Sequence, residues 1–143
     1  MSKFSNCIIK LESFGDHRGA ITVSDGFPVD GHDLSRAYWM TDLKSGEPRG
    51  FHAHKSLWQV AICPVGRCEV VLDDGSSRER LYLEGAQNAV IFPPMVWHEL
   101  YNFSDDCCVL VLASASFDET DYIRDYEQFL AMLDSQSTSK LGD

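Results

Sequence analysis

Short runs rich in β-branched and aromatic residues recur along most of the chain, and polar turn segments separate them. The runs are CIIKL, GAITVSD, RAYWMTDL, LWQVAICPVG, CEVVLDDG, ERLYLEG, NAVIFPP, WHELYNF and CCVLVLAS. Gly, Pro, Asp and Ser dominate the segments between them, as in GFPVDGHD, KSGEPRG and DDGSS. Strands that follow one another at such regular spacing, with no helix between them, predict an all-β antiparallel sandwich or barrel.

The pattern changes after Ser116, where apolar residues recur at helical spacing. They are Tyr122, Tyr126, Phe129, Leu130 and Leu133, in the stretch FDETDYIRDYEQFLAML. Asp118 or Thr120 can cap this stretch, so the pattern predicts one C-terminal helix on the β-core. The final DSQSTSKLGD is polar. We therefore expect a single domain over residues 1–133 and a flexible polar tail over residues 134–143.

Composition narrows the choice of partners. The chain has 143 residues, 44% of them apolar, which is enough to bury a core in one domain. The net charge of −10 argues against nucleic-acid and anionic-membrane partners, since both need a basic face. No apolar run has the length of a membrane span or a signal peptide, so we expect a cytoplasmic protein. Five cysteines without a CxxC pair predict reduced thiols.

The segment RGFHAHKS carries the most informative chemistry. His52 and His54 follow the turn SGEPRG and open a strand, so alternation puts both side chains on one face. Arg49 and Lys55 flank them, although Lys55 alternates to the opposite face. Imidazoles exchange protons near neutral pH, and nearby cations favour the neutral ring and hold negative charge. The pattern therefore indicates a proton-moving site, as enolisation beside a ketone requires.

The spacing of these residues resembles the two motifs of the cupin superfamily. His52, His54 and Gly66 fit the first motif, while Pro93, His98 and Asn102 fit the second. Gln59 occupies the position where cupins place a metal-binding glutamate, and a neutral amide does not offset the charge of a metal ion. Three imidazoles alone can still hold zinc. On an unbroken strand Gln59 would face away from the histidines, so a bend near Lys55–Ser56 is needed to turn it inward.

Over residues 8–133 the chain resembles, more narrowly, the nucleotide-sugar 3,4-ketoisomerases. The resemblance lies in RGFHAHK, QVAICPVGRCEVVLDDG, FPPMVWHELYNFSDDCCVLVLAS, DETDYIRDYEQF, GDHRGAIT and RAYWMTDL. It implies a cupin jelly-roll barrel and a homodimer that exchanges N-terminal strands, with neither a metal nor another cofactor. It also implies conversion of dTDP-4-keto-6-deoxyglucose to the 3-keto isomer through an enediol, with His52 and His54 as the acid–base residues.

Further residues are candidates for binding the substrate. Arg49, Tyr38 and Arg18 can contact sugar oxygens or the diphosphate, because the arginine fork fits phosphate. His98 is either a site member or a core histidine, and Lys55 ranks below the others. The thymine ring needs an aromatic face or an amide, for which the options are Trp97, Tyr101 and Gln59.

Other functions remain open at this level. One is a metal-dependent cupin enzyme, against which Gln59 counts. Another is a dTDP-sugar 3,5-epimerase, which would leave the ketone at carbon 4. The last is a non-catalytic nucleotide-sugar-binding cupin, which would bind without turnover.

Overall fold

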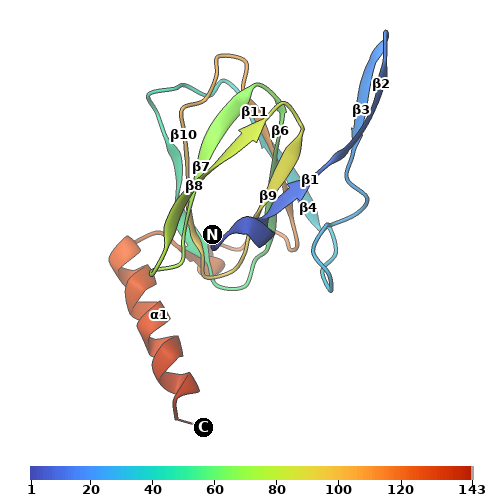
Figure 1. Ribbon diagram of the computed structural model, residues 1–143. Helices are drawn as coiled ribbons and strands as arrows, with labels where there is room; N and C mark the ends of the chain where they lie inside the picture. The colour runs from blue at the N-terminus through green and yellow to red at the C-terminus, as the bar shows by residue number, and fades with distance from the viewer. Residues whose placement is uncertain (143) are drawn as a thin grey trace.

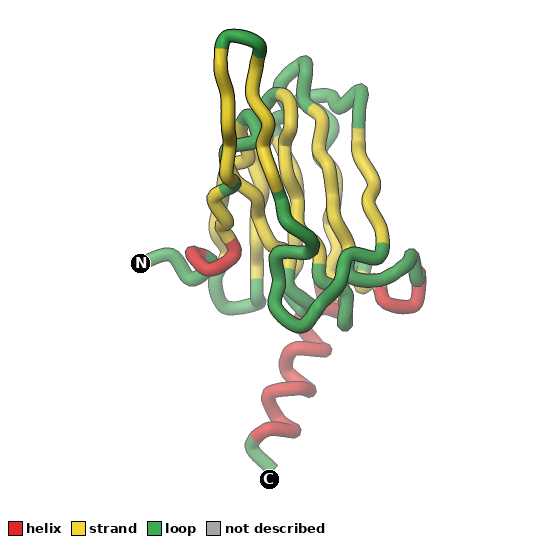
Figure 2. The backbone as a smooth tube through the Cα atoms, turned by 90° about the vertical axis from the view of Figure 1, so that its right-hand side faces the viewer, coloured by secondary structure: helices red, strands yellow, loops and turns green. Residues whose placement is uncertain are grey.

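In the computed structural model, which describes residues 1–142, two antiparallel five-stranded sheets face each other (Figure 1 and Figure 2). The first contains, in order, β1 (Ile8–Lys10), β9 (Asn88–Phe92), β6 (Gln59–Val65), β11 (Cys108–Ala113) and β4 (Arg36–Met40). The second contains β12 (Tyr122–Ile123), β5 (Arg49–His54), β10 (Trp97–Tyr101), β7 (Arg67–Asp73) and β8 (Arg78–Glu84). Strands β4 to β7 alternate between the two sheets, and so do β8 to β11. This arrangement confirms the predicted all-β jelly-roll barrel with a single helix at its C-terminal end.

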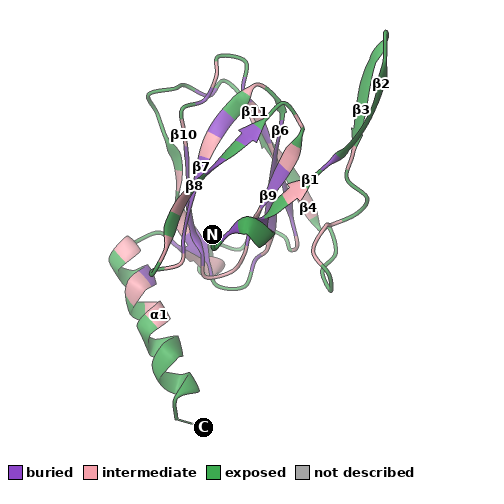
Figure 3. Cartoon of the chain, viewed as in Figure 1, coloured by how far each residue is buried: buried purple, intermediate pink, exposed green. Residues whose placement is uncertain are grey.

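Apolar side chains from both sheets fill the barrel. Alternate positions on β7 and β11 point inward, and Val70, Leu72, Val109 and Val111 are each 2% exposed or less. Each such side chain stabilises the fold by about 1.5–3 kcal/mol relative to exposure. The strand interiors are buried while most of the helix surface is exposed (Figure 3). The cysteines are free thiols, as predicted, and all but Cys108 are buried.

A separate hairpin stands away from the barrel. It consists of β2 (Glu12–Asp16) and β3 (Gly19–Val23), which pair only with each other (Figure 1). Phe14 and Ile21 lie opposite each other in the hairpin and are 62% and 70% exposed. The hairpin therefore leaves two large apolar side chains exposed on a ribbon that pairs with no other strand among residues 1–142.

The C-terminal segment differs from the prediction in where its helix begins. A short 3-10 turn, η2 (Glu119–Asp121), and strand β12 precede helix α1 (Tyr126–Lys140). The N-cap is Asp125, whose carboxylate accepts a hydrogen bond of 2.8 Å from the Gln128 backbone N–H. Phe129 is fully buried against the second sheet, so the apolar face of the helix is confirmed.

Helix α1 also continues past residue 133, through most of the predicted flexible tail. The hydroxyls of Ser135, Ser137 and Thr138 each donate to the carbonyl four residues earlier, at 2.8, 3.1 and 2.9 Å. These bonds satisfy the polar side chains within the helix, which composition alone did not reveal. Asp143 lies outside the described residues. No helix among residues 1–142 is long and apolar enough to cross a membrane.

Candidate functional site

A bulge between β5 and β10 builds one end of the barrel interior. His98 pairs with His52 and Glu99 pairs with Gly50, with a register shift between these two pairs. Gly50 has φ +91° and Phe51 has φ +61°, both in the left-handed region. A Cβ at Gly50 would lie 2.9 Å from the His98 carbonyl oxygen, so this position requires glycine.

The bulge changes which side chains share a face. Arg49 and His52 are three residues apart and would face opposite sides of a regular strand. In the structure both line one cavity of about 250 Å³. The extra residue in β5 therefore brings a guanidinium and an imidazole together in a way that simple alternation does not predict.

Three imidazoles cluster at this cavity. His52 Nε2 lies 3.1 Å from His98 Nε2, so one ring donates a hydrogen bond and the other accepts it. One ring nitrogen from each of His52, His54 and His98 lies within 4.8 Å of the others. His52 and His98 line the cavity, whereas His54 lies behind them and is only 2% exposed. The predicted placement of His52 and His54 on one inner face is correct, and His98 joins them there.

Burial keeps these rings neutral. It lowers the pKa of His52 to about 4 and the pKa of His98 well below its usual value. Burial also lowers the pKa of His54, although Asp121 opposes the effect. The direction matches the sequence-based expectation, but desolvation is the main cause rather than neighbouring cations. At neutral pH the rings therefore have lone pairs that can accept a proton.

Three arginines surround the cavity mouth, which gives it local positive charge in an acidic protein. Arg36, Arg49 and Arg124 all belong to its lining. The guanidinium of Arg36 lies over the Tyr38 ring at 4.7 Å, and that of Arg124 over the Tyr122 ring at 4.1 Å. Such a cluster suits a ligand with several negative charges, such as a diphosphate.

Tyr38 and Gln59 connect the cavity to the core. Tyr38 lines the cavity, and its hydroxyl accepts a 3.0 Å hydrogen bond from Gln59 Nε2. Gln59 is 1% exposed, and its Oε1 has no partner among the described residues. The chain crosses from β5 to β6 in the opposite sheet at residues 55–58, which turns Gln59 inward. This crossing is the bend that the cupin alignment requires.

Besides His54 and Gln59, which lie next to the cavity lining, four predicted site residues lie away from the cavity. Trp97 and Tyr101 lie on the opposite face of β10 from His98, where both donate to the Glu99 carboxylate. Lys55 donates instead to the Thr120 carbonyl, at 2.9 Å. Arg18 lies on the β2–β3 hairpin, paired with Asp16. Trp97 is one residue and Tyr101 three residues from His98 along β10. Because side chains alternate along a strand, both lie on the face opposite His98 and away from the cavity.

Several residues at the site were not predicted as site members. Arg36, Tyr122 and Arg124 line the cavity, and Asp121 contacts His54. Arg124 pairs with Glu119 and also reaches the cavity. Asp121, Tyr122 and Arg124 arrive through the pairing of β12 with β5, in which Tyr122 pairs with His54, whereas Arg36 begins β4 in the opposite sheet. Nothing in the local pattern indicated that register.

The three histidines also fit a divalent metal of the zinc type, which three imidazoles can bind with one position left open. A metal bound there would polarise a keto oxygen as a Lewis acid. The fourth cupin position, Gln59, is neutral and its amide nitrogen faces Tyr38. The donor set therefore lacks the carboxylate that would offset the metal charge.

Comparison with known proteins identifies the family. The family model described as FdtA, WxcM-like, C-terminal, matches residues 5–134. A TDP-4-oxo-6-deoxy-α-D-glucose-3,4-oxoisomerase from Aneurinibacillus thermoaerophilus is 39% identical over 137 residues, which is 96% of this chain and 99% of that protein. The chain belongs to the FdtA family.

Solved structures of FdtA-like enzymes have the same fold. A 3,4-ketoisomerase from Helicobacter canadensis is 36% identical, with a TM-score of 0.83 over 89% of this chain and 96% of that one. A histidine variant of the 3,4-ketoisomerase QdtA from Thermoanaerobacterium thermosaccharolyticum, in complex with TDP-4-keto-6-deoxyglucose, is 32% identical. Its TM-score is 0.84 over 90% of this chain and 93% of that one. The cupin-like barrel and the ketoisomerase resemblance predicted from the sequence are confirmed.

Proposed function

We propose that this FdtA-family chain is a sugar 3,4-ketoisomerase that converts dTDP-4-keto-6-deoxyglucose to a dTDP-3-keto-6-deoxyhexose for deoxyamino-sugar synthesis. The observation that carries the proposal is the cavity in which His52 and His98 lie beneath three arginines. Neutral imidazoles supply a base, and the arginines supply positive potential for an anionic substrate. The full-length match to an oxoisomerase supports the same reaction.

The proton transfer follows from the properties of the imidazoles. A neutral His52 removes the proton on carbon 3 of the 4-keto sugar, and the electrons of that bond form an enediolate. The positive guanidinium of Arg49 stabilises the developing negative charge. The hydroxyl proton on O3 then moves to O4, and return of a proton to carbon 4 leaves a ketone at carbon 3 and a hydroxyl at carbon 4. His52 and His54 are the proposed acid–base residues, and His98 is hydrogen-bonded to His52 as a proton-exchanging neighbour.

The substrate-binding roles divide between the walls of the cavity. The proposed ligands of the diphosphate are Arg36, Arg49 and Arg124, because one guanidinium group can donate two parallel hydrogen bonds to two phosphate oxygens. Tyr38, held by Gln59, presents its hydroxyl to sugar oxygens. The mechanism uses no metal, because proton transfer by imidazole accounts for the reaction with the groups in the cavity. Trp97, Tyr101 and Lys55 have no substrate role in this proposal.

We infer that the enzyme is a homodimer with exchanged N-terminal strands. The hairpin exposes Phe14 and Ile21, and an apolar hollow of about 420 Å³ includes Leu11, Leu34 and Leu110. A second copy of the hairpin would cover apolar surface of this kind. Exchange of the hairpin would also carry Arg18 toward the partner subunit. In that arrangement Arg18 remains a candidate ligand of the diphosphate. The proposed location is the cytoplasm, without nucleic-acid or membrane partners.

Light scattering after gel filtration tests the dimer. The expected mass is twice the 16.1 kDa of one chain. Placing a charge in the exposed apolar pair, as in Ile21→Lys, should shift the equilibrium toward monomer. A wild-type mass of one chain at micromolar concentration would refute the exchange.

Incubation with dTDP-4-keto-6-deoxyglucose in deuterium oxide, followed by NMR, tests the reaction. The ketoisomerase predicts a 3-keto product with deuterium at carbon 4. Deuterium at carbons 3 and 5 with the ketone at carbon 4 would instead identify a 3,5-epimerase. An unchanged substrate that nevertheless binds would identify a non-catalytic sugar-binding protein.

A further inference from the structure

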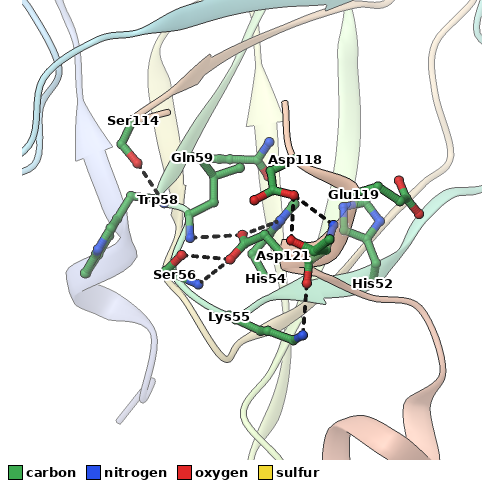
Figure 4. A network of polar contacts seen from close by, with 12 residues as sticks. His52, His54, Lys55, Ser56, Trp58, Gln59, Ser114, Asp118, Glu119 and Asp121 are labelled. Atoms are coloured by element: carbon green, nitrogen blue, oxygen red, sulfur yellow. Dashed lines mark hydrogen bonds and ion pairs between the residues drawn. The ribbon is translucent and has the colours of Figure 1, made fainter. Parts of the chain in front are cut away.

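Asp121 approaches the imidazole cluster from the C-terminal segment of the chain. It ends the η2 turn directly before β12, and β12 pairs with β5 so that Tyr122 lies opposite His54. Its side chain is only 13% exposed. Its Oδ2 lies 3.2 Å from His54 Nδ1 (Figure 4). A carboxylate therefore lies against a histidine that is itself only 2% exposed.

Backbone and side-chain donors hold this carboxylate in place. Oδ1 accepts hydrogen bonds from the Ser56 N–H at 2.9 Å and the Ser56 hydroxyl at 2.7 Å. Oδ2 accepts a further bond from the Leu57 N–H at 3.2 Å. Burial alone would raise the pKa of Asp121, but the hydrogen bonds from Ser56 and Leu57 outweigh it, and the pKa is lowered. The carboxylate is therefore ionised and has no proton to donate.

An ionised carboxylate only accepts hydrogen bonds, and this determines the tautomer of His54. The proton of neutral His54 must lie on Nδ1, where it is donated to Asp121. The lone pair then lies on Nε2, which is buried and has no hydrogen-bond partner among the described residues. His54 belongs to the cluster in which one ring nitrogen from each of His52, His54 and His98 lies within 4.8 Å of the others.

We propose that Asp121 is a positioning residue that holds His54 as its Nδ1–H tautomer and so makes Nε2 its proton-accepting atom. During turnover Nε2 is the atom through which His54 acts as the second acid–base residue, beside His52, which removes the proton on carbon 3. The imidazolium formed in between lies against the Asp121 carboxylate, which stabilises its charge. This inference rests on the proposed ketoisomerase for its kinetic part but not for the tautomer itself.

The contacts of Asp121 predict what its amide would do. In Asp121→Asn one carboxylate oxygen becomes an NH2 group. Ser56 supplies two donors, with the shorter distances, to Oδ1, so the remaining oxygen should stay there. The NH2 group then faces His54 Nδ1, which must accept its proton. His54 should therefore change to the Nε2–H tautomer and lose its proton-accepting atom.

Long-range proton–nitrogen NMR on ¹⁵N-histidine-labelled protein tests the tautomer directly, because protonated and lone-pair ring nitrogens have different shifts. The wild type should show His54 with its proton on Nδ1, and Asp121→Asn should show it on Nε2. Kinetically, Asp121→Asn should lower kcat by about 100-fold or more, with KM changed by less than about threefold.

Asp118→Asn is the matched control, with the same charge change in the same segment. Asp118 uses only Oδ1 to accept from the Thr120 N–H and hydroxyl, and an asparagine oxygen can replace it. This variant should keep the wild-type tautomer and kcat. Ser56→Ala tests whether the Ser56 hydroxyl, which holds the Asp121 carboxylate, is itself needed to set the His54 tautomer. It removes one donor to Asp121 but leaves the contact with His54, so the tautomer should persist.

The outcomes are distinct. A wild-type His54 protonated on Nε2 would overturn the proposal, and so would an Asp121→Asn enzyme with kcat within threefold of wild type. The wild-type measurement needs no variant, so it holds even if Asp121→Asn does not fold. If the wild type shows no turnover at all, the proposed function fails while the tautomer is still measured.

Discussion

Strand β10 buries His98 on its inner face and Glu99 on its outer face, and each residue is 5% exposed or less. On the outer face the Glu99 carboxylate accepts from Trp97 Nε1 at 2.8 Å and from the Tyr101 hydroxyl and Arg78 at 2.6 Å each. Asp73 extends this network, since it accepts from Arg78 and from the Tyr126 hydroxyl of helix α1. Each of these carboxylates has protein partners.

The inner face is the opposite case. The buried polar atoms without a hydrogen-bond partner among the described residues are His52 Nδ1, His54 Nε2, His98 Nδ1 and Gln59 Oε1. Unsatisfied buried polar atoms are rare and costly in folded proteins. Here two of them belong to the cavity-lining His52 and His98, and the others belong to His54 in the same imidazole cluster and to Gln59, which bonds the cavity-lining Tyr38. The carboxylates of the outer network have hydrogen-bond partners and connect helix α1 to the barrel. The inner cluster has buried donors and acceptors that are available to bind a substrate.

The largest effect should come from the inner cluster. His52→Asn removes the ring nitrogen that exchanges the proton, so kcat should fall by about 10²–10⁴-fold. The free energy of unfolding should fall by about 1–3 kcal/mol, because the buried His98 Nε2 loses its hydrogen bond to His52. Steady-state kinetics and urea unfolding of the same preparation check both numbers. A kcat within threefold of wild type would mean that the cavity histidine is not the base.

The converse variant breaks the outer network. Glu99→Ala leaves the buried Trp97 N–H without its acceptor and should cost about 2 kcal/mol of unfolding free energy. Its kcat should stay within about threefold of wild type, since Glu99 faces away from the cavity. Glu69→Ala is the control, because it removes a carboxylate from a more exposed ion pair with Arg80, worth less than about 1 kcal/mol. Loss of activity without loss of stability in Glu99→Ala would reverse the assignment of the two faces.

The pH dependence of stability should separate the faces on a finer scale. Burial lowers the pKa of folded His52 to about 4, against about 6.5 in an unfolded chain. The unfolded chain therefore binds more protons between these values, and stability falls as the pH falls through that window. His52→Asn should flatten this slope in urea titrations. An unchanged slope in the variant would contradict the burial of a neutral ring.

Glu99 should act at lower pH. Burial would raise its pKa, but the hydrogen bonds from Tyr101, Trp97 and Arg78 outweigh it, so the pKa is lowered from the usual value near 4.5. Its stabilisation is present above that value and is lost only as the pH falls through the lower, folded pKa. Glu99→Gln should therefore alter the stability profile below about pH 4.5 and leave the histidine window unchanged.

Local sequence pattern predicted the parts of this molecule that depend on neighbouring residues. Alternation placed His52 and His54 on one face, and turn chemistry separated the strands correctly. The first residue of the helix could also have been predicted from the sequence, because the DYEQ segment places the capping Asp125 three residues before Gln128. Alternation along β10 would also have separated Trp97 and Tyr101 from His98.

The rest depends on pairing between distant segments. Arg124 and Asp121 reach the histidines only because β12 pairs with β5, and a two-residue strand carries no periodic signal. Arg49 reaches the cavity through a bulge in which Phe51 has a positive φ angle. Phenylalanine rarely adopts such a conformation, so the sequence does not indicate it. The depth of burial that lowers the histidine pKa values is likewise a property of the assembled barrel.

The central proposal is that imidazole groups transfer the proton in this barrel without a metal ion. The direct measurement is an NMR time course of dTDP-4-keto-6-deoxyglucose with chelator-treated protein whose metal content has been determined. We predict that the keto resonance moves to carbon 3 at the rate of untreated enzyme. Loss of conversion that returns only when zinc, iron or manganese is added back would contradict the account.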